Sequence, residues 1–574
     1  VDISLQESTR VTEEMLAAAD VLITVCGHAD EHCPVVPPDL VRIHWPLSDP
    51  ARAEGDEAAI SAVFRASRDD IRDRLPKKPA TTNGKKIALI GAGPASFTVA
   101  NDLAPLGYEC TIFEKLDKPG GLMRSNIPAF RLPESVLMDE LGYILDMGVE
   151  LKLGTPVESM SALLKEGYDA VFVGTGAPKG KDLGLPGREE SEANIHIGIN
   201  WLEEVAFEHT DKIGENVLII GVGNTAMDCC RSSLRLGAKD VKVMARKPRA
   251  FFKASEWELE DAEEENVDIL VNHSPKAFVH ENGKLTGMLF ELMEYDLDEA
   301  GRITEQRVVG EKVIPCDDVI LAIGQENAFP WIEDDAGIEF DKWSVPVVDK
   351  VTFESSRKGV FFGGDSAFGP LNIIWAVEHG HQAAISIHNH CRGLPLTDRL
   401  PDQINLSSAK MGMAEWRYSN AFDASSRRKM EHVELVDRFK KIDTEVELGF
   451  TAEQIATEVQ RCLNCDVHTI FDAPLCEECD ACIDVCPVEC LTITPNAESE
   501  KELRDALSAS DPTVDQDLFV STALPLTGRV MIKDENICLH CGLCAERCPT
   551  SAWDMKEGVI KINHAADQLE PTEA

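Results

Sequence analysis

Short runs of apolar residues recur through the middle of the chain, each followed by a glycine-rich turn and then by a stretch with helical spacing. This alternation extends from Ile87 to about Gly393. Short apolar runs bounded by turns are typical of strands buried on both faces, and their alternation with helices is typical of parallel sheets. The pattern therefore predicts the α/β fold class, with two nested doubly wound dinucleotide-binding domains.

The pattern changes on either side of this region. Val21–Cys26 is a strand-like run and Glu57–Leu75 has helical spacing, which together predict a small N-terminal α/β module. A linker rich in Pro, Gly and Lys follows at Pro76–Lys86. Beyond the α/β region, Ser425–Thr444 predicts helix within a polar connector that wraps back on the body. The acidic stretch Asn496–Asp517 predicts an exposed loop.

The first glycine-rich turn has the features of a nucleotide site. The strand Lys85–Ile90 leads into a turn in which Gly91 permits the tight bend and Gly93 lets the backbone approach a pyrophosphate. Ser96 stands in the third-glycine position and is small enough for close helix–strand packing. Glu114, near the end of the next strand, is placed to hold a ribose hydroxyl. A glycine-rich turn of purely structural use would explain this motif alone equally well.

Three further segments fit the same site. Gly120–Leu122 follows the acid, and Val173–Gly180 is a strand that ends in a small-residue turn. Val360–Ser366 places Asp365 at a strand end, ahead of the helical stretch Ile373–His388. Together these segments resemble the two-dinucleotide-domain flavoproteins, and that resemblance implies FAD.

In those flavoproteins the acid of the Gly-Gly-Asp motif bonds the flavin ribityl chain, and the next helix points its N-terminus at the pyrimidine edge. The resemblance assigns these roles to Asp365 and to the backbone around Asn372–Ile374. A helix N-terminus stabilises negative charge on the reduced ring. The expected FAD-binding residues are Gly91, Gly93, Ser96, Glu114, Gly121, Leu122, Gly176, Gly364, Asp365, Asn372 and Ile373.

A second glycine-rich turn lies between the two halves of the first domain, at Gly221–Asp228. The strand after it ends in Arg246 and Lys247, where an NAD site would show an acid. Cations there suit a 2′-phosphate and favour NADPH, with Arg249 and Lys253 as helpers, although surface basic residues after a strand would look the same. The expected NADPH-binding residues are Gly221, Gly223, Asn224, Ala226, Arg246 and Lys247.

The nesting of the two domains bears on the chemistry. A nicotinamide domain inserted between two halves of a flavin domain stacks the nicotinamide on the flavin, so hydride passes directly and no catalytic acid or base is expected. The inserted domain has no Cys-x2-Cys pair. The adjacent Cys229 and Cys230 cannot form a reversible dithiol without strain, and we expect them to be buried on a helix.

The net charge and the cysteine content indicate which partners, location and chemistry to expect of the protein. The formal net charge is -44, which argues against a nucleic-acid partner and favours a solvated acidic surface. No apolar run is long enough for a membrane span, and no secretory signal is visible, so we expect a cytoplasmic location. The chain has 18 cysteines, and the stretch Cys462–Cys548 holds most of them. Clustered cysteines in a cytosolic chain indicate metal or redox chemistry rather than disulfides.

Two cysteine runs have the spacing of bacterial ferredoxins. Each reads Cys-x2-Cys-x2-Cys-x3-Cys-Pro, in which three cysteines bind one [4Fe–4S] cluster and the fourth ligates the other. Zinc usually takes separated pairs rather than runs of four, so it fits poorly. One cluster is predicted on Cys476, Cys479, Cys482 and Cys548, and the other on Cys538, Cys541, Cys544 and Cys486. Cys462, Cys465 and Cys490 either bind a further metal or have a structural role.

The region from Lys85 to Gly393 resembles the small subunit of NADPH-dependent glutamate synthase and related flavoproteins. The likeness rests on GAGPAS, GGLMRSNIPAFRLPE, VGTGAPKG, GVGNTAMD and GGDSAFGPLNIIWAVEHGHQAA. The cysteine-rich tail resembles the subset that is fused to a two-cluster ferredoxin and accompanies 2-oxoacid:ferredoxin oxidoreductases. The glutamate synthase subunit carries its clusters before the flavin domain, and that N-terminal cysteine domain is missing here.

Residues 1–75 resemble the C-terminal part of arsenate reductases with the low-molecular-weight phosphatase fold. Cys26 and Cys33 match the redox pair of the thioredoxin-coupled members, and Asp49 matches the acid of that fold. The nucleophilic Cys-x5-Arg loop should precede Val1. Its absence predicts either an incomplete, non-catalytic docking module or a natural chain that extends upstream.

These observations predict an electron-transfer subunit that moves electrons between NADP(H), FAD and two [4Fe–4S] clusters, on to or from a ferredoxin or 2-oxoacid oxidoreductase partner in a hetero-oligomer. A glutamate synthase-type NADPH dehydrogenase, an arsenate or thiol reductase using Cys26–Cys33, and a docking subunit with structural cofactors are the alternatives. The expected domains are the N-terminal module 1–78, the FAD-binding halves 79–213 and 327–395, the NADPH-binding domain 214–326, the connector 396–460, and a ferredoxin-like α+β domain 461–574.

Overall fold

The computed structural model of the chain forms two compact units. The larger unit comprises 57–400, 431–448 and 564–574, and the smaller comprises 1–56, 401–430 and 449–563. Within these ranges the structure describes residues 21–24, 41–44, 79, 81–298, 301–400, 403–408, 426–461, 467–496, 502–503, 518–561 and 563–567.

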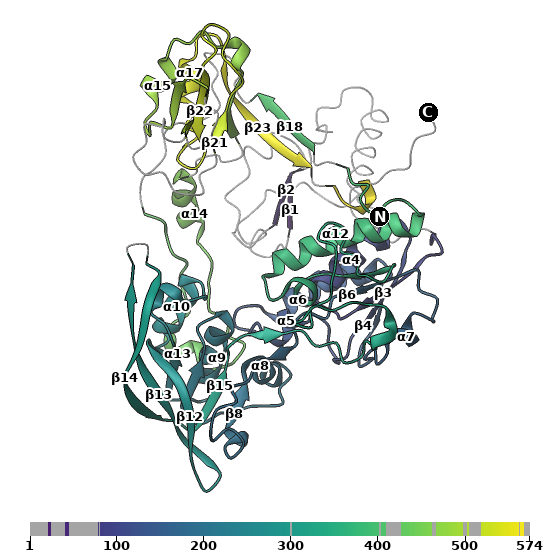
Figure 1. Cartoon of the computed structure of the whole chain (residues 1–574), viewed down its shortest axis with the longest axis vertical. Helices are drawn as coiled ribbons and strands as arrows, with labels where there is room; N and C mark the ends of the chain where they lie inside the picture. Colours follow the sequence, from purple (N-terminus) through teal and green to yellow (C-terminus); the bar gives the residue numbers. More distant parts are fainter. Residues whose placement is uncertain are drawn as a thin grey trace, which may run out of the picture. The chain divides into compact units, whose positions relative to one another are not determined.

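The larger unit contains a five-stranded parallel sheet with the order β17-β6-β3-β4-β5. These strands span Val360–Phe362, Ala170–Val173, Lys86–Ile90, Glu109–Phe113 and Glu150–Lys152 respectively. Figure 1 shows the helices α4 (Pro94–Leu103) and α12 (Ile373–Arg392) side by side along this sheet. Further helices of this half are α5 (Leu122–Ser125), α6 (Glu134–Asp146), α7 (Met160–Leu163) and α11 (Asp365–Phe368).

Both faces of this first sheet are covered. Ile87 and Leu89 of β3 belong to the core that α4 and α12 share, whereas Ala88 and Ile90 belong to the core on the opposite face. A strand with alternate side chains in two cores must be apolar throughout, which explains its uninterrupted hydrophobic sequence. Gly380 lets α12 lie against α4, because an added Cβ would stand 2.7 Å from the Ala95 carbonyl oxygen.

A second five-stranded parallel sheet has the order β11-β10-β9-β15-β8. The strands span Asp268–Leu270, Asp240–Met244, Asn216–Ile220, Asp318–Leu321 and Ile195–Ile197. Its helices are α8 (Gly198–Ala206), α9 (Asn224–Arg235) and α10 (Glu256–Glu264). The strand β8 belongs to this second sheet although it precedes residue 214, so the predicted domain boundary between residues 213 and 214 does not coincide with the start of the sheet. A three-residue strand carries no local signal of which sheet it joins.

Two smaller sheets complete the nested region. An antiparallel sheet consists of β12 (His273–Glu281), β13 (Lys284–Leu297) and β14 (Ile303–Pro315). The two-residue strands β7 (Lys179–Gly180) and β16 (Gln325–Glu326) pair where the chain enters and leaves the second domain. The predicted fold class, α/β with two nested doubly wound domains, is confirmed.

Residues 431–448, here called the strap, return to the larger unit. A one-turn helix, α13 (Leu435–Arg438), is the helical part of the strap, so the predicted helix over Ser425–Thr444 is wrong for most of its length. The strap backbone bonds instead across itself and to the body, through Val433 N–H to the Val446 oxygen and Val446 N–H to the Phe130 oxygen. Arg438 anchors the strap on α10, with Nη2 2.9 Å from Glu264 Oε1.

The smaller unit contains two three-stranded antiparallel sheets, ordered β18-β23-β19 and β20-β22-β21. The first is formed by Gln403–Ser408, Trp553–Lys561 and Val467–Phe471, and the second by Leu491–Thr494, Val530–Asp534 and Leu518–Val520. The short helices α15 (Ala481–Val485) and α17 (Leu543–Arg547) lie in contact and carry cysteines of the two runs. A further helix, α14 (Ala452–Glu458), begins with a capping box formed by Thr451 and Gln454.

Part of the predicted N-terminal module is described. The strands β1 (Val21–Thr24) and β2 (Val41–His44) form a parallel pair, which places a strand within the predicted run Val21–Cys26. Cys26, Cys33 and Asp49 lie outside the described residues, as do Cys462, Cys465, the start of the linker and nearly all of the acidic insert.

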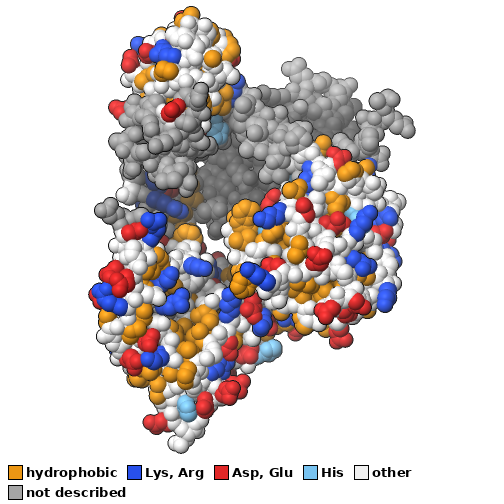
Figure 2. Space-filling view, viewed as in Figure 1, with side chains coloured by type: hydrophobic (Ala, Val, Ile, Leu, Met, Phe, Trp, Pro, Cys, Tyr) orange, Lys and Arg blue, Asp and Glu red, His pale blue; other side chains and the backbone are white. Residues whose placement is uncertain are grey.

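The surface carries many charged side chains, as the charged composition predicts (Figure 2). Figure 2 shows acidic and basic side chains interspersed over the face in view. Among the helices of the described segments, none has both the length and the apolar character needed to cross a bilayer.

Candidate functional site

The carboxyl ends of the strands in the first sheet border a cavity of about 300 Å³. Ligands of open α/β sheets bind at this edge. All of the predicted FAD-binding residues except Ser96 line it, together with residues that the sequence did not single out. The predicted lining residues are Gly91, Gly93, Glu114, Gly121, Leu122, Gly176, Gly364, Asp365, Asn372 and Ile373, and the additional ones include Asn126, Thr175, Asp228, Gln325, Pro370 and Leu371.

Close backbone contacts explain the glycines of this cavity. Gly91 has φ +92°, and an added Cβ would lie 2.8 Å from the Gly174 carbonyl oxygen. Gly121 has φ +54°, and its Cβ would lie 2.9 Å from the Cα of Gly93. Side chains at these positions would displace the backbone that forms the cradle. The cradle therefore fits a group that needs the bare backbone of Gly93, such as a pyrophosphate at the start of α4.

Ser96 is buried and does not line the cavity. It packs beneath the turn after β6, where a Cβ on Gly174 would lie 2.4 Å from Ser96 Oγ. This position accounts for the small residue in the third-glycine slot, because helix and strand come close together there. Ser96 thus shapes the cradle from below.

Glu114 holds the first turn in place. Its Oε2 accepts a hydrogen bond from Ala92 N–H at 2.7 Å, and Oε1 accepts one from Leu116 N–H at 2.9 Å. The carboxylate is buried and also lines the cavity. A carboxylate has about four acceptor sites, so Glu114 retains capacity for a ribose hydroxyl.

Asp365 stands at the end of β17, on the far side of the cavity. Its Oδ1 accepts a hydrogen bond from Leu371 N–H at 3.0 Å, and burial raises the pKa of this carboxyl. The preceding residue, Gly364, has φ +64° and donates its N–H to His379 Nδ1 at 3.2 Å. His379 is buried between Phe353 and Phe368, and this burial lowers its pKa. A neutral His379 therefore supports the backbone beneath Asp365.

The long helix α12 begins at the cavity. Asn372 is its N-cap, and its Oδ1 accepts a hydrogen bond from Trp375 N–H at 3.1 Å. The first helical residue, Ile373, also lines the cavity. The N-terminal end of this helix thus presents amide groups and a partial positive charge to whatever binds there.

The second glycine-rich turn opens onto the same cavity. Gly221 has φ +131°, and its Cβ would lie 2.1 Å from the Ala322 carbonyl oxygen. Gly223 is the N-cap of α9, and Ala226 is buried within that helix. Asn224, the first residue of α9, lines the cavity that Gly91 and Gly93 also line. The two turns therefore meet at one site.

The basic residues after β10 are partly available for a phosphate. Arg246 is exposed, and Lys247 is half-buried with Nζ 5.5 Å from the Phe251 ring centre. Neither has an ion pair with an acid among the described residues. Arg249, by contrast, pairs with Glu256 at 2.7 Å and Glu263 at 2.5 Å. Arg249 is thus engaged within its own domain, which weakens its predicted role as a helper.

An ion-pair group that the sequence did not single out joins the two nucleotide-binding halves. Arg131, in the loop before α6, has Nη1 2.7 Å from Asp228 Oδ1 on α9, and Nη2 pairs with Glu258 on α10. Asp228 lines the cavity. Arg131 lies within the segment GGLMRSNIPAFRLPE, in which no local pattern indicates Asp228 or Glu258 as its partner.

The cysteines expected to bind clusters gather around two separate cavities. Cys476, Cys479, Cys482 and Cys548 line one, and Cys486, Cys538, Cys541 and Cys544 line the other. The fourth cysteine of each run therefore lies with the first three of the other run, as the ferredoxin spacing predicts. Thiolates are the donors that [4Fe–4S] clusters require, so both cavities fit such a cluster.

A ninth cysteine accompanies the second set. Cys490 is buried in the same cavity, and its Sγ lies 3.4 Å from Cys486 Sγ. Cys490 lies four residues after the last cysteine of the first run, so the ferredoxin spacing does not predict that it lies beside Cys486. Cys229 and Cys230, as expected, are fully buried on α9, and burial raises the pKa of both thiols.

Comparison with known proteins gives the family. The family model described as pyridine nucleotide-disulphide oxidoreductase matches residues 85–380, and the one described as 4Fe-4S dicluster domain matches residues 475–552.

Three relatives share much of the chain. It is 36% identical over 394 residues to the NADP(+)-dependent formate dehydrogenase subunit beta of Moorella thermoacetica, covering 67% of this chain and 55% of that protein. It is 32% identical over 425 residues to the NADPH-Fe(3+) oxidoreductase subunit beta of Geobacter sulfurreducens, covering 68% and 62%. It is 31% identical over 338 residues to the glutamate synthase [NADPH] small chain of Azospirillum brasilense, covering 55% and 69%.

The chain thus spans 55% of the length of the formate dehydrogenase subunit and 62% of the length of the NADPH-Fe(3+) oxidoreductase subunit. The match to the family model, by contrast, covers more than half of this chain and contains both glycine-rich turns. The chain therefore belongs to the pyridine nucleotide-disulphide oxidoreductase family, as an oxidoreductase that uses FAD, NADPH and two [4Fe–4S] clusters held by a dicluster domain.

Proposed function

We propose that the chain transfers electrons between NADP(H), FAD and its two [4Fe–4S] clusters, and on to or from a ferredoxin or a 2-oxoacid:ferredoxin oxidoreductase-type partner. One observation carries this proposal: both glycine-rich turns open onto a single cavity. Asn224 and Thr225 of the second turn line it together with Gly93 and Asp365 of the first domain. This shared cavity supports direct contact between a nicotinamide and a flavin ring.

The residues around the cavity bind and orient rather than transfer protons. When bound, FAD accepts two electrons with a hydride and releases them one at a time, which matches the single electrons that clusters carry. The amides at the start of α4 and α12 suit the phosphates and the reduced ring respectively. Glu114 accepts a hydrogen bond from the backbone of the first glycine-rich turn, and His379 accepts one from Gly364 N–H beside Asp365, so both side chains hold the cavity backbone in place.

Electron exit through the clusters is supported by the cysteine positions. Among the described residues no cysteine lines the flavin cavity. Cys229 and Cys230 are buried with raised pKa values, so neither is a reactive thiolate. The described residues therefore place no dithiol at the flavin cavity, and the proposed exit for electrons is through the cluster cysteines.

The test is an anaerobic titration with NADPH, followed by visible absorption and low-temperature EPR. The wild-type protein should lose flavin absorbance and then develop signals from reduced clusters. Cys541→Ala removes one predicted ligand, so it should lose reduction of one-electron acceptors by more than about tenfold while NADPH still bleaches the flavin. Cys391→Ala, a cysteine of α12 outside both cluster cavities, is the matched control and should behave as wild type.

Two outcomes would contradict the proposal. If NADPH did not bleach the flavin in the wild-type protein, the shared cavity would not serve hydride transfer. If Cys541→Ala reduced one-electron acceptors as fast as wild type, the clusters would not be the exit. Flavin reduction without cluster reduction by NADPH would place the normal flow in the opposite direction, from the partner toward NADP⁺, and the same titration with reduced ferredoxin would then bleach the flavin.

A glutamate synthase-type NADPH dehydrogenase is the second candidate, because the likeness to the Azospirillum small chain covers 69% of that protein. In this candidate the electron acceptor is the large subunit of a glutamate synthase instead of a ferredoxin-linked protein. The two candidates differ in the acceptor that stimulates NADPH oxidation. Stimulation by oxidised ferredoxin supports the first, and its absence together with stimulation by a glutamate synthase large subunit supports the second.

A further inference from the structure

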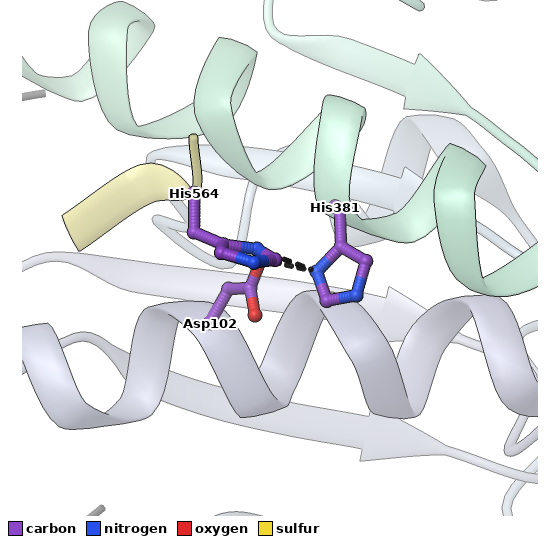
Figure 3. A group of neighbouring side chains, drawn as sticks. All are labelled: Asp102, His381 and His564. Carbon is purple, nitrogen blue, oxygen red and sulfur yellow. Dashed lines mark hydrogen bonds and ion pairs between the residues drawn. The ribbon is translucent and has the colours of Figure 1, made fainter. Parts of the chain in front are cut away.

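Three side chains from distant parts of the sequence meet on the larger unit, away from the flavin cavity. Asp102 lies near the end of α4, His381 lies in α12, and His564 immediately precedes the short helix η8 (Ala565–Asp567). Figure 3 shows the two imidazole rings and the carboxylate turned toward one another. The Gly93 end of α4 is about 13 Å away along the helix axis, so this cluster is separate from the cradle.

The three donor atoms lie close together. His381 Nδ1 is 2.7 Å from Asp102 Oδ2, His564 Nδ1 is 3.2 Å from His381 Nδ1, and His564 Nδ1 is 3.6 Å from Asp102 Oδ2. Each residue therefore directs one nitrogen or oxygen atom at a common point. If His381 Nδ1–H donates to Asp102, that nitrogen has no lone pair left to accept a hydrogen bond from His564 Nδ1. Protons alone therefore do not satisfy all three atoms, and the arrangement suits a shared cation.

The distances match a tetrahedral ion. Zinc bonds to His nitrogen and Asp oxygen are about 2.0–2.2 Å long, which places neighbouring ligand atoms of a tetrahedron about 3.4 Å apart. The three observed separations, 2.7, 3.2 and 3.6 Å, lie on both sides of that value. An ion can therefore contact all three atoms after small side-chain adjustments. We propose that Asp102, His381 and His564 form a zinc site that is separate from the flavin cavity and from the cluster cysteines.

The surroundings of Asp102 prepare it as a ligand. Its side chain is 5% exposed, and Asn101 Nδ2 lies 3.2 Å from Oδ1, which leaves Oδ2 to face the histidines. The amide that fixes the carboxylate resembles the hydrogen bonds that orient metal ligands in established sites.

The donor set selects the metal. Calcium and magnesium prefer oxygen ligands in larger numbers, so two imidazoles and one carboxylate fit them poorly. Imidazole suits zinc, copper and nickel, and a fourth position filled by water completes a tetrahedron for zinc. The side chain of His564 is 42% exposed, which leaves room for that water. Zinc has no redox chemistry, so the ion would not interfere with electron flow.

The site has a structural consequence. Its ligands come from α4, α12 and the segment that follows β23, the last strand of the smaller unit. Ala565 packs in the same core as α4 and α12. Zinc would therefore fix the segment His564–Asp567 on the flavin-binding half more firmly than a few hydrogen bonds can. This is a tether for the C-terminal segment, independent of the proposed function.

Zinc binding to the holoprotein tests the proposal. The protein, freed of loose metal with EDTA, is dialysed against graded zinc, and zinc and iron per chain are measured by plasma mass spectrometry. The wild type should bind one zinc per chain. His381→Ala and Asp102→Asn should each weaken that binding by at least about tenfold. His390→Ala is the matched control on the same helix, since His390 lies 4.0 Å from Glu354 and not at the cluster.

Iron and flavin content show whether a variant has kept its fold and its clusters, because empty cluster cysteines would also take zinc. If His381→Ala fails to fold, His564→Gln serves instead, because it changes the most exposed of the three ligands. Zinc should also raise the temperature of flavin release in the wild type and in His390→Ala, but not in His564→Gln. Equal zinc binding by wild type and the ligand variants, or no zinc binding by the wild type, would overturn the proposal.

Discussion

Arg131 and Asp228 connect the two nucleotide-binding halves through an ion pair with Nη1 2.7 Å from Oδ1. Arg131 belongs to the flavin-binding half and Asp228 to α9 of the nicotinamide-binding half, where it also lines the shared cavity. The same guanidinium pairs with Glu258 on α10. One cation thus faces two carboxylates that are 5% and 2% exposed. This contact fixes how the two halves approach each other at the cavity.

Arg131→Met should destabilise the larger unit by about 3–5 kcal/mol, because it leaves two buried carboxylates without their counterion. Flavin release monitored by fluorescence during heating measures the effect. Arg302→Ala is the control, since Arg302 forms a surface pair with Asp298 and is 80% exposed. That change should cost less than about 1 kcal/mol. Similar losses in both variants would refute a special role for Arg131.

The loss in Arg131→Met should grow with pH. Burial raises the pKa of Asp228 and of Glu258 even with Arg131 present. A carboxyl whose pKa is raised by folding contributes stability below its unfolded pKa, and that contribution is lost as the pH rises through its folded pKa. Removal of Arg131 raises both values further. The difference in melting temperature between variant and wild type should therefore be larger at pH 8 than at pH 5, and a difference independent of pH would contradict this account.

Local sequence patterns were sufficient for the parts of the site that depend on one segment. Gly91 and Gly93 are recognisable because a turn between strand and helix needs them at fixed spacing, and the cysteine runs are recognisable for the same reason. The pair Arg131–Asp228 spans 97 positions and arises only when the two halves pack. The cluster of Asp102, His381 and His564 also joins residues that are distant in the sequence, and it forms when α4, α12 and the C-terminal segment pack together.

Tertiary contacts also overrode local preference. The segment Ser425–Thr444 has helical spacing, yet α13 is the helical part of its described residues. Val433 N–H bonds instead to the Val446 carbonyl oxygen, and Val446 N–H bonds to the Phe130 carbonyl oxygen. Those bonds depend on the surface of the larger unit, which no local pattern describes. Cys490 could not be placed for a different reason. The ferredoxin spacing pattern ends at Cys486, so it does not predict that Cys490 lines the same cavity as Cys486.

NADPH preference should depend on Arg246 and Lys247. The double variant Arg246→Ala/Lys247→Ala should raise KM for NADPH by about 100-fold or more, because each of the two charged hydrogen bonds contributes about 1.5–3 kcal/mol. The KM for NADH should change little, since NADH lacks the 2′-phosphate. Arg249→Ala is a suitable comparison, as its guanidinium is already paired with Glu256 and Glu263. Equal changes for both nucleotides would remove these residues from 2′-phosphate recognition.

Asp365 should contribute to retention of FAD. Asp365→Ala removes a carboxylate from the cavity wall and also the acceptor for Leu371 N–H, so FAD should bind about 10–100-fold more weakly. Asp365→Asn keeps an acceptor for that N–H and should lose less. Flavin content after gel filtration and fluorescence titration of the apoprotein measure the change. Asp335→Ala, an exposed acid of the same half, should leave FAD binding unchanged, and a loss there as large as in Asp365→Ala would argue against a direct role.

Cys490 should tune one cluster and not the other. Its Sγ lies 3.4 Å from Cys486 Sγ, a predicted ligand of the cluster that also uses Cys538, Cys541 and Cys544. A thiol that donates to a ligand sulfur stabilises the more negative, reduced cluster and raises its potential. Cys490→Ala should therefore lower that potential by about 40 mV, which corresponds to a hydrogen bond of about 1 kcal/mol for one electron. Cys490→Ser keeps a donor and should lower the potential less.

In an EPR-monitored redox titration the cluster on Cys476, Cys479, Cys482 and Cys548 serves as the internal reference. A shift of both clusters by the same amount would indicate a general change in the domain, and an unchanged pair would show that Cys490 makes no such bond.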